Sequence, residues 1–212
     1  MKEWDVIAED FDATRRSPWE ECTDFIEGIR GICLDIGCGN GRHLIPASEK
    51  CSIAVGLDFS IKMLEMAKRN IMEKGIENVI LIGGDARRLP FPDNFFDGIL
   101  FIASLHNIRR RKERIQSLSE VRRVLKQNSR VIISVWAKWQ DRWRRHFLLH
   151  PFGGDIYVPW KRGVKVMRFY HLYSMGELKR DVKKAGLRIE KAWSVKKASK
   201  KYPDNLFVIA KK

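Results

Sequence analysis

The stretch that most constrains the fold is a short apolar run ending in a glycine-rich loop, over residues 31–41. The run from Ile32 to Ile36 is too short for a core helix and predicts a buried strand. Glycines let the backbone turn sharply and approach a ligand closely, and this loop has them at alternating positions from Gly37 to Gly41. A helix is expected to start near Arg42, with its N-terminus facing the loop. Strand, glycine loop and helix in this order form the nucleotide-binding unit of doubly wound sheets.

Apolar runs alternate with amphipathic stretches along the rest of the chain, which indicates a single α/β domain over residues 1–212 with a mostly parallel sheet. We expect strands at about 32–36, 53–57, 79–82, 96–101, 130–136, 187–195 and 205–210, the last two as a closing hairpin. We expect helices at about 3–12, 18–28, 41–49, 60–74, 111–126 and 174–185. Ser17, Ser60 and Ser174 are the predicted N-caps of three of these helices.

Three aspartates lie at the carboxyl ends of successive predicted strands, which is where ligands bind in such sheets. Asp35 lies two residues before the first glycine, where an acid repels a pyrophosphate but suits a cation such as the amino group of a methionine-like moiety. Asp58 is placed to accept hydrogen bonds from ribose hydroxyls, and Asp85 to meet an adenine amino group. Phe59 and Met63 are candidates for the adenine pocket. One such aspartate alone is more often a turn or cap residue, but three in register with a glycine loop indicate a cofactor site.

The glycine loop with its preceding acid resembles motif I of the class I S-adenosylmethionine (SAM) methyltransferases. More specific segments cover nearly the whole chain and include Thr14–Trp19, Leu89–Asn107, Val158–Trp160, Arg168–His171 and Asp204–Ala210. Together they resemble the tRNA wobble-uridine carboxymethyl methyltransferases. The resemblance implies a seven-stranded Rossmann-like sheet, mostly parallel with an antiparallel last strand, and helices on both faces. The chain departs from the family pattern at Asn107, where a second histidine is common, and at Phe169, where a tyrosine is common.

The resemblance also implies SAM as the cofactor and methyl transfer to a carboxylate on the uracil C5 substituent of tRNA. A carboxylate is ionised at neutral pH, so no strong general base is needed and catalysis depends on placing one oxygen in line with the methyl group. The cofactor-binding positions that it implies are Asp35, Gly37, Cys38, Gly39, Asn40, Gly41, Asp58, Phe59, Ser60, Met63, Asp85, Ala86 and Ile102.

The matched segments imply four candidates for the catalytic part of the acceptor site, which are Arg15, His106, Arg168 and His171. The fork of an arginine matches the two oxygens of a carboxylate, so Arg15 and Arg168 are the expected clamp. His106 is expected to position the acceptor by hydrogen bonding. Stacking surfaces for an extruded base are expected from Trp19, Trp136, Tyr170 and His171. Taken singly, each has a structural alternative, such as an ion pair between Arg15 and Asp12 or a core position for an aromatic ring.

Basic residues are concentrated in the C-terminal third of a chain whose formal net charge is +15. Residues 1–137 hold 21 Lys and Arg against 20 Asp and Glu, whereas residues 138–201 hold 18 against 5. A solvated basic surface is the simpler alternative, but this concentration favours contact with a polyanion, here tRNA. The candidate phosphate contacts are Arg142, Arg144, Arg145, Lys161, Arg162, Lys165, Lys179, Lys183, Lys184, Lys196, Lys197, Lys200 and Lys201.

Two segments outside the sheet are expected to shape the substrate site. Residues 1–30 are expected to form a helical lid, and residues 138–173 an irregular basic insertion that binds substrate. Asn205, at the start of the last strand, is a further candidate substrate contact. No metal site is expected, because the four cysteines form no C-x-x-C pair and lack neighbouring histidines.

Relatives in the resembled family work with a small zinc-binding activator subunit, so the resemblance implies such a partner here. The apolar strand Val79 to Ile82 lies at a sheet edge in the expected strand order, where an added strand would cover it. No apolar run reaches 18 residues and the N-terminus has no apolar signal core, so we expect no membrane span and a cytoplasmic location.

Two other functions stay open at the level of sequence. The chain could methylate a small-molecule acceptor, although the basic segment argues against this. It could also be an RNA-binding protein whose methyltransferase fold no longer binds SAM, although the intact glycine loop and its three aspartates argue against that.

Overall fold

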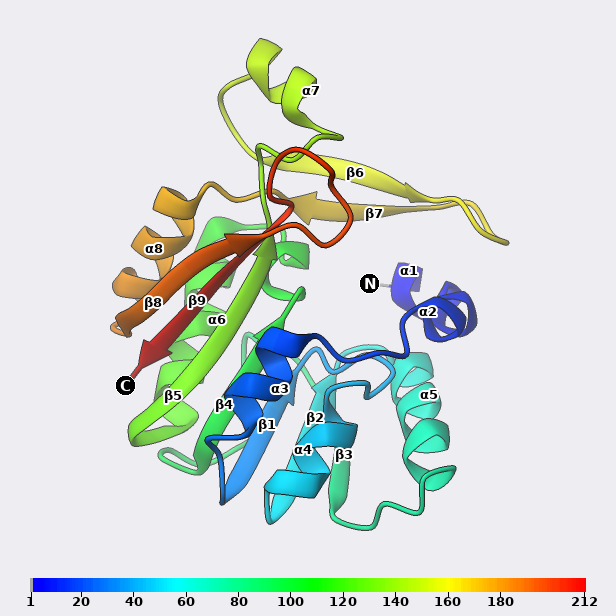
Figure 1. Cartoon of the computed structure of the whole chain (residues 1–212), viewed down its shortest axis with the longest axis vertical. Helices are drawn as coiled ribbons and strands as arrows, with labels where there is room; N and C mark the ends of the chain where they lie inside the picture. The colour runs from blue at the N-terminus through cyan, green and yellow to red at the C-terminus, as the bar shows by residue number, and fades with distance from the viewer. Residues whose placement is uncertain (1) are drawn as a thin grey trace.

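The computed structural model describes residues 2–212 and contains a seven-stranded sheet with the order β3-β2-β1-β4-β5-β9-β8 (Figure 1). Its strands are β1 (Ile32–Ile36), β2 (Ile53–Asp58), β3 (Val79–Gly83), β4 (Phe96–Ile102), β5 (Leu125–Trp136), β8 (Arg188–Val195) and β9 (Asn205–Lys211). β9 runs antiparallel to both of its neighbours, and the other neighbouring pairs are parallel. The predicted seven-stranded sheet with an antiparallel last strand is therefore confirmed.

Helices cover both faces of the sheet because the strands are apolar on both sides (Figure 1). The helices are α1 (Lys2–Val6), α2 (Ala8–Thr14), α3 (Glu20–Ile26), α4 (Leu44–Lys50), α5 (Ile61–Met72), α6 (Arg111–Val124), α7 (Arg144–Leu149) and α8 (Met175–Lys184), with a 3-10 turn η1 (Leu105–Asn107). α6 and α8 share one core with Ile99 of β4, whereas α3, α4 and α5 share the other with Leu100. Consecutive residues of a strand thus serve opposite cores, as the period of two requires.

The first helices differ from the prediction. The helix expected over residues 3–12 is divided at Ile7 into α1 and α2. The next helix begins at Glu20, because Trp19 before it is still extended (φ −88°, ψ 139°), so the predicted cap at Ser17 was wrong. Ser60 and Ser174 do cap α5 and α8, each accepting a hydrogen bond from a backbone N–H three residues on.

The segment of residues 138–173, here called the insertion, is more regular than predicted. It contains α7 and an antiparallel hairpin of β6 (Asp155–Trp160) and β7 (Val166–His171). Ile156, Val158 and Trp160 are buried at alternate positions, so β6 follows the period of a half-buried strand. Figure 1 shows the insertion beyond the carboxyl ends of the parallel strands. It therefore overhangs the edge of the sheet where ligands bind.

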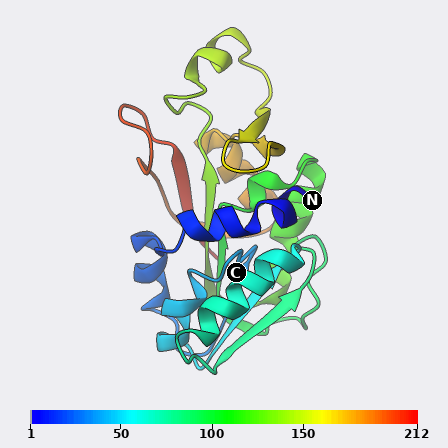
Figure 2. The same ribbon diagram turned by 90° about the vertical axis from the view of Figure 1, so that its right-hand side faces the viewer.

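The N-terminal helices α1 and α2 lie between α5 and the hairpin β6–β7 (Figure 2). Ile7 and Ala8 pack with Met63 of α5 and with Trp160 of β6. Asp5 accepts a hydrogen bond from the hydroxyl of Ser60 at 2.6 Å, which fixes α1 to the start of α5. The N-terminal segment thereby closes one side of the carboxyl edge. Within residues 2–212, no helix has the length and apolar character needed to cross a membrane.

Candidate active site

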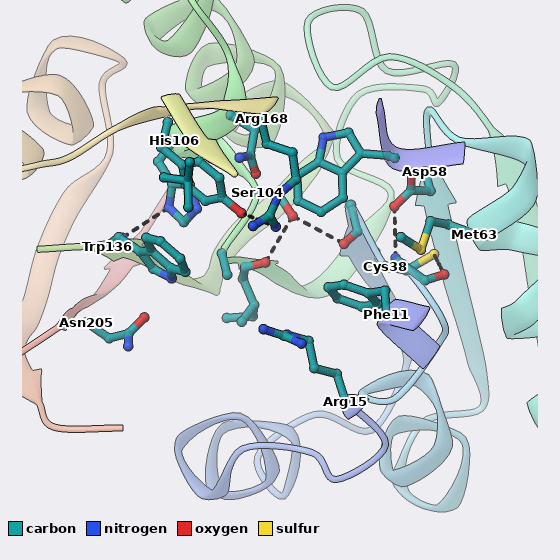
Figure 3. A pocket seen from close by; sticks show the side chains of 18 of the residues that line it. Phe11, Arg15, Cys38, Asp58, Met63, Ser104, His106, Trp136, Arg168 and Asn205 are labelled. Carbon is teal, nitrogen blue, oxygen red and sulfur yellow. Dashed lines mark hydrogen bonds between the residues drawn. The ribbon is translucent and has the colours of Figure 1, made fainter. Parts of the chain in front are cut away.

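A cavity of about 1740 Å³ opens at the carboxyl ends of β1, β2 and β4 (Figure 3). The glycine loop, the N-terminal segment, the insertion and the loop between β8 and β9 contribute its walls. Sites for a single small molecule span roughly 300–1,000 Å³. The larger cavity here has room for a cofactor and an acceptor side by side.

The glycine loop forms the cofactor half of the cavity. Gly37 and Gly39 have positive φ of 69° and 54°, a conformation that side chains rarely adopt. A Cβ on Gly37 would also collide with the side chain of Ser104, just after β4. The backbone N–H of Gly39 donates to Asp58 Oδ2 at 2.8 Å, which holds the loop against the end of β2. Burial raises the pKa of Asp58.

The three predicted aspartates face the cavity differently. Asp58 and Asp85 line it, whereas Asp35 is buried beneath the glycine loop and does not reach the wall. Burial raises the pKa of Asp35 to about 8, against the effect of the neighbouring Arg42. Asp35 Oδ2 is buried without a hydrogen-bond partner in residues 2–212, so its contact with the cofactor's amino group stays a prediction, and Gly41 also lies off the cavity wall.

Asp85 is already paired at the cavity wall. Its two carboxylate oxygens accept three hydrogen bonds from Arg87 side-chain nitrogens at 2.6–3.0 Å. Burial acts to raise the pKa of Asp85, but these hydrogen bonds outweigh it and hold the pKa below its ordinary value. Asp85 therefore stays ionised and can accept a further hydrogen bond from a ligand amino group.

Asn40 joins the glycine loop to the N-terminal segment. Its Nδ2 donates to Asp12 Oδ1 at 2.8 Å and to the carbonyl oxygen of Arg15 at 3.0 Å. Its Oδ1 is buried without a hydrogen-bond partner in residues 2–212. A buried acceptor of this kind next to a cavity indicates a donor that a ligand supplies. The loop, this oxygen and Asp58 fit the amino-acid and ribose parts of SAM, and further lining residues are Cys38, Phe59, Ser60, Met63, Ala86 and Ile102.

Two arginines mark the acceptor half of the cavity. Arg15 follows α2 and Arg168 lies on β7, and Figure 3 shows them directed into the cavity from different elements. Arg168 is buried and donates through Nη1 to the hydroxyl of Tyr170 at 2.7 Å. Within residues 2–212 neither arginine forms an ion pair, because no carboxylate oxygen lies within 4.0 Å of its nitrogens. Burial lowers the pKa of Arg15, as does the neighbouring Arg168.

His106 lies fully buried next to this pair (Figure 3). The backbone N–H of Trp136 donates to its Nδ1 at 3.0 Å, which assigns the proton of a neutral ring to Nε2. Nε2 has no hydrogen-bond partner in the described residues. Burial lowers the pKa of His106 to about 3, and neighbouring positive charges act in the same direction. The ring is therefore a neutral donor at physiological pH.

The aromatic candidates stack on one another more than predicted. The rings of Trp136 and Tyr170 lie 4.5 Å apart at an angle of 19°, and Tyr170 is buried. Trp136 is half-buried and is the better surface for a base, whereas Tyr170 has its face covered. Trp19 lines the cavity and makes edge contacts with His43 and Phe207.

His171 does not line the cavity in the structure, so its catalytic role stays a prediction without support from this geometry. Its Nδ1 lies 2.6 Å from Asp155 and its Nε2 lies 2.8 Å from Glu177, so both ring nitrogens are occupied. Side chains alternate along β7, so Arg168 and Tyr170 share one face while His171 takes the other. His171 instead connects the hairpin to α8.

The basic candidates separate into two groups. Those that line the cavity mouth are Arg142, Lys161, Arg162, Lys197 and Lys200. Arg144 and Arg145 lie on α7, and Lys179, Lys183 and Lys184 on α8, all outside the lining. The remaining Lys165, Lys196 and Lys201 are exposed outside it as well. The structure therefore places five of the thirteen predicted phosphate contacts at the cavity mouth and the other eight away from it.

The loop of residues 196–203, here called the basic loop, is held in shape by two carboxylates. Asp204 accepts hydrogen bonds from the backbone N–H groups of residues 197, 198 and 199 at 2.6–2.7 Å. Asp141 accepts from those of residues 200, 201 and 202 at 2.8–2.9 Å. Asn205 lies beside this loop on the cavity wall and donates to Asp204 at 3.1 Å.

Sequence reasoning missed Trp160 as a site residue. Its ring lies in the cavity wall in contact with both arginines, 5.3 Å from Arg15 Cζ and 4.8 Å from Arg168 Cζ. It belongs to the Val-Pro-Trp segment that carried part of the family resemblance. That segment was the available signal for its place in the site.

The fold is shared with known methyltransferases. A SAM-dependent methyltransferase from Methanosarcina mazei has a TM-score of 0.76 at 21% identity, over 92% of this chain and 98% of that one. A chain in the complex of a methyltransferase activator with a putative methyltransferase from Haloferax volcanii has a TM-score of 0.71 at 17% identity, over 99% and 97% of the two chains.

Sequence similarity identifies the family within this shared fold. Residues 34–133 match the family described as a methyltransferase domain. A tRNA (carboxymethyluridine(34)-5-O)-methyltransferase of Schizosaccharomyces pombe is 30% identical over 209 residues, covering 86% of this chain and 86% of that protein. That match covers more of the chain than the methyltransferase domain of residues 34–133. The chain belongs to the tRNA carboxymethyluridine methyltransferase family of SAM-dependent enzymes.

Proposed function

We propose that this enzyme esterifies the carboxylate of 5-carboxymethyluridine at the wobble position of a tRNA. The observation that carries the proposal is the pair of Arg15 and Arg168, two guanidinium groups without carboxylate partners in residues 2–212. The planar fork of a guanidinium group matches the two oxygens of a carboxylate. The activity named for the S. pombe relative and the basic rim of the cavity support the same substrate.

Three residues of the acceptor half position the carboxylate for methyl transfer. SAM, when bound, supplies a methyl group activated by the positive sulfur. Arg15 and Arg168 hold the carboxylate so that one oxygen stays free to point at the methyl carbon, and His106 donates through Nε2 to an acceptor oxygen. The acceptor is already ionised, so no residue has to remove a proton. Alignment of the two reacting atoms is then the main source of rate.

The test is a methyl-transfer assay with purified enzyme, methyl-labelled SAM and tRNA that carries 5-carboxymethyluridine. The recovered tRNA is treated with mild alkali, which hydrolyses a methyl ester and releases the label as volatile methanol. We expect volatile label from the wild type and a loss of at least about tenfold for Arg168→Met, since a charge-assisted hydrogen bond contributes about 1.5–3 kcal/mol. Label that resists alkali would show methylation of a base or ribose and would overturn the proposed substrate.

We further infer that a small zinc-binding activator subunit pairs with the free edge of β3. Within residues 2–212, β3 pairs with β2 alone, and Ile80 on it is 49% exposed. An apolar edge strand of this kind promotes aggregation unless another chain covers it. The H. volcanii complex supports the existence of such a partner for this fold.

Co-purification with the zinc-binding subunit of the same organism tests this edge. Ile80→Lys is expected to abolish the complex, because a charge would enter the paired edge. Leu149→Lys, at an exposed apolar residue of α7, serves as the matched control and is expected to keep it. Equal capture of both variants would place the partner elsewhere.

A further inference from the structure

Trp160 brings two positive charges from distant parts of the chain onto one ring. The guanidinium carbons of Arg15 and Arg168 lie 5.3 Å and 4.8 Å from the centroid of its indole. Arg15 comes from the N-terminal segment and Arg168 from β7, so neither element alone fixes their separation. An aromatic face attracts a guanidinium group, and one ring that contacts two of them sets where each one lies.

The indole is itself fixed in place. It is buried and packs with Ile7 of the N-terminal segment and Met63 of α5. Its N–H donates to Asp10 Oδ2 at 3.3 Å, which connects β6 to α2. Further aromatic faces complete the support, with Phe11 under Arg15, and Trp4 under Arg168. The two guanidinium groups therefore have little freedom to turn away from each other.

Aromatic faces hold these charges without neutralising them. No carboxylate within residues 2–212 forms an ion pair with Arg15 or Arg168. Guanidinium groups stay protonated at any physiological pH, so both charges persist in a half-buried site. Such a site gains strongly from an anion placed between the two groups and gains little from a neutral ligand of the same shape.

We propose that Trp160 is a positioning residue that sets Arg15 and Arg168 as a paired clamp, and that this clamp binds the acidic acceptor but releases its neutral ester. The inference rests on the proposed function. Methyl transfer joins a carboxylate oxygen to the methyl carbon and breaks the carbon–sulfur bond, whose electron pair stays on sulfur. No proton moves, and the negative charge of the acceptor disappears. The product therefore loses the interaction that held the substrate.

The test compares binding of three anticodon stem-loops that differ at one group. They carry 5-carboxymethyluridine, its methyl ester or its neutral amide at the wobble position, and binding is measured with the demethylated cofactor present. Wild type is expected to bind the acid about tenfold or more tightly than either neutral form, as a charged hydrogen-bonding pair predicts. Trp160→Leu is expected to reduce that preference to about twofold or less, while its affinity for the ester stays close to that of wild type.

Two further variants separate positioning from packing. Trp160→Phe retains an aromatic face and is expected to keep most of the preference for the acid. Trp193→Leu removes a tryptophan of β8 that stacks on Phe207 outside the cavity and carries Lys191 on its face, and it is expected to keep the full preference. Equal weakening of acid and ester by Trp160→Leu would show a purely structural role and would overturn the inference.

The outcomes also distinguish this inference from the proposed function. A wild-type enzyme that produces alkali-labile ester but binds acid and ester equally would refute the clamp and leave the activity standing. A wild-type enzyme that produces no ester from 5-carboxymethyluridine would refute the activity itself.

Discussion

At the scale of single residues, burial decides what His106 can do. A histidine just after a strand in a methyltransferase fold is a candidate for a general base. The structure removes that role, since burial lowers the pKa of His106 to about 3 and its Nδ1 already accepts from the backbone of Trp136. What remains is the proton on Nε2, which is buried and has no hydrogen-bond partner in the described residues. Its contribution is a hydrogen bond, and the pH dependence of the enzyme should reflect that.

For wild type we expect no inflection from His106 in the pH profile of kcat/KM between about 5.5 and 8, because a neutral donor does not titrate there. His106→Gln can still present an N–H near the position of Nε2 and should retain much of kcat. His106→Asn accepts from Trp136 but lacks that donor, and it should lose about tenfold, the value of one hydrogen bond. An inflection near pH 6.5 that disappears in His106→Gln would instead show a general base.

Asp35 is expected to make the free energy of unfolding depend on pH. Its folded pKa of about 8 lies above the value of about 3.9 for a free aspartate. Between these values the folded state holds a proton that the unfolded state has released. The free energy of unfolding should therefore fall as pH rises from about 4 to 8, by up to about 1.4 kcal/mol per pH unit from this group.

Urea denaturation of wild type and Asp35→Asn at pH 5.5 and 7.5 isolates that effect. The asparagine has the same shape and cannot titrate, so the stability of wild type relative to Asp35→Asn should decline over this interval. Buried His106 contributes with the opposite sign in both proteins and cancels in the comparison. Parallel pH dependence of the two proteins would show that Asp35 is ionised in the fold.

At the scale of elements, the parallel sheet was predictable and the insertion was not. The central strands β1, β2 and β4 are buried on both faces, so each appears in the sequence as a continuous apolar run between turn residues. The strand β6 alternates instead, with exposed Asp155 and Tyr157 between buried positions, and contains Pro159, which obscures the pattern. Missing the hairpin also misplaced His171, because only a strand assignment over 166–171 shows that it faces away from Arg168.

The basic loop and α8 give a matched pair of elements for testing RNA contact. Both carry a pair of exposed neighbouring lysines, but only the pair of the loop includes a residue at the cavity mouth, Lys200, with Lys201 next to it in the chain. Lys200→Glu with Lys201→Glu should weaken tRNA binding about tenfold or more and should reduce the salt dependence of log Kd by about 2, as expected for two lost phosphate contacts.

Lys183→Glu with Lys184→Glu makes the same change of charge on α8. We expect it to alter tRNA affinity by less than about threefold, since long-range attraction is screened beyond about 10 Å at 0.1 M salt. Equal losses in the two double variants would mean that net charge, rather than the location of the loop, governs binding.

At the scale of the whole molecule, the site exists because the fold brings together segments far apart in the chain. Most residues predicted for the cofactor half do line the cavity, since the glycine loop and the ends of adjacent strands are local features of the sequence. The neighbourhood of Arg15, Trp160 and Arg168 could not be predicted from spacing, because it depends on how the N-terminal helices dock on α5 and the hairpin. Only the family resemblance singled out the two arginines.

Asp12 of α2 connects the N-terminal segment to the glycine loop and to α5. It is buried and accepts from Asn40 of the glycine loop at 2.8 Å and from Asn70 of α5 at 2.7 Å. Asp12→Ala leaves both amide groups without that acceptor and should destabilise the fold by about 2 kcal/mol or more. It should also raise the KM for SAM, because one of the two hydrogen bonds of Asn40 that join the loop to the N-terminal segment would be lost.

Thermal unfolding and initial rates at varied SAM concentration check this effect. Asp24→Ala, at an exposed residue of α3, is the control and should behave as wild type. A stable Asp12→Ala protein with unchanged KM would show that the connection has no part in cofactor binding.

The two carboxylates that hold the basic loop also make one wall of the cavity continuous with the sheet. Asp141 belongs to the insertion and Asp204 adjoins β9, so six hydrogen bonds from backbone N–H groups join the loop to the insertion and to the central sheet. The opposite wall consists of α1 and α2, which are held mainly by side chains. The two walls of the cavity are therefore fixed in different ways, one through the backbone of a loop and the other through packed side chains.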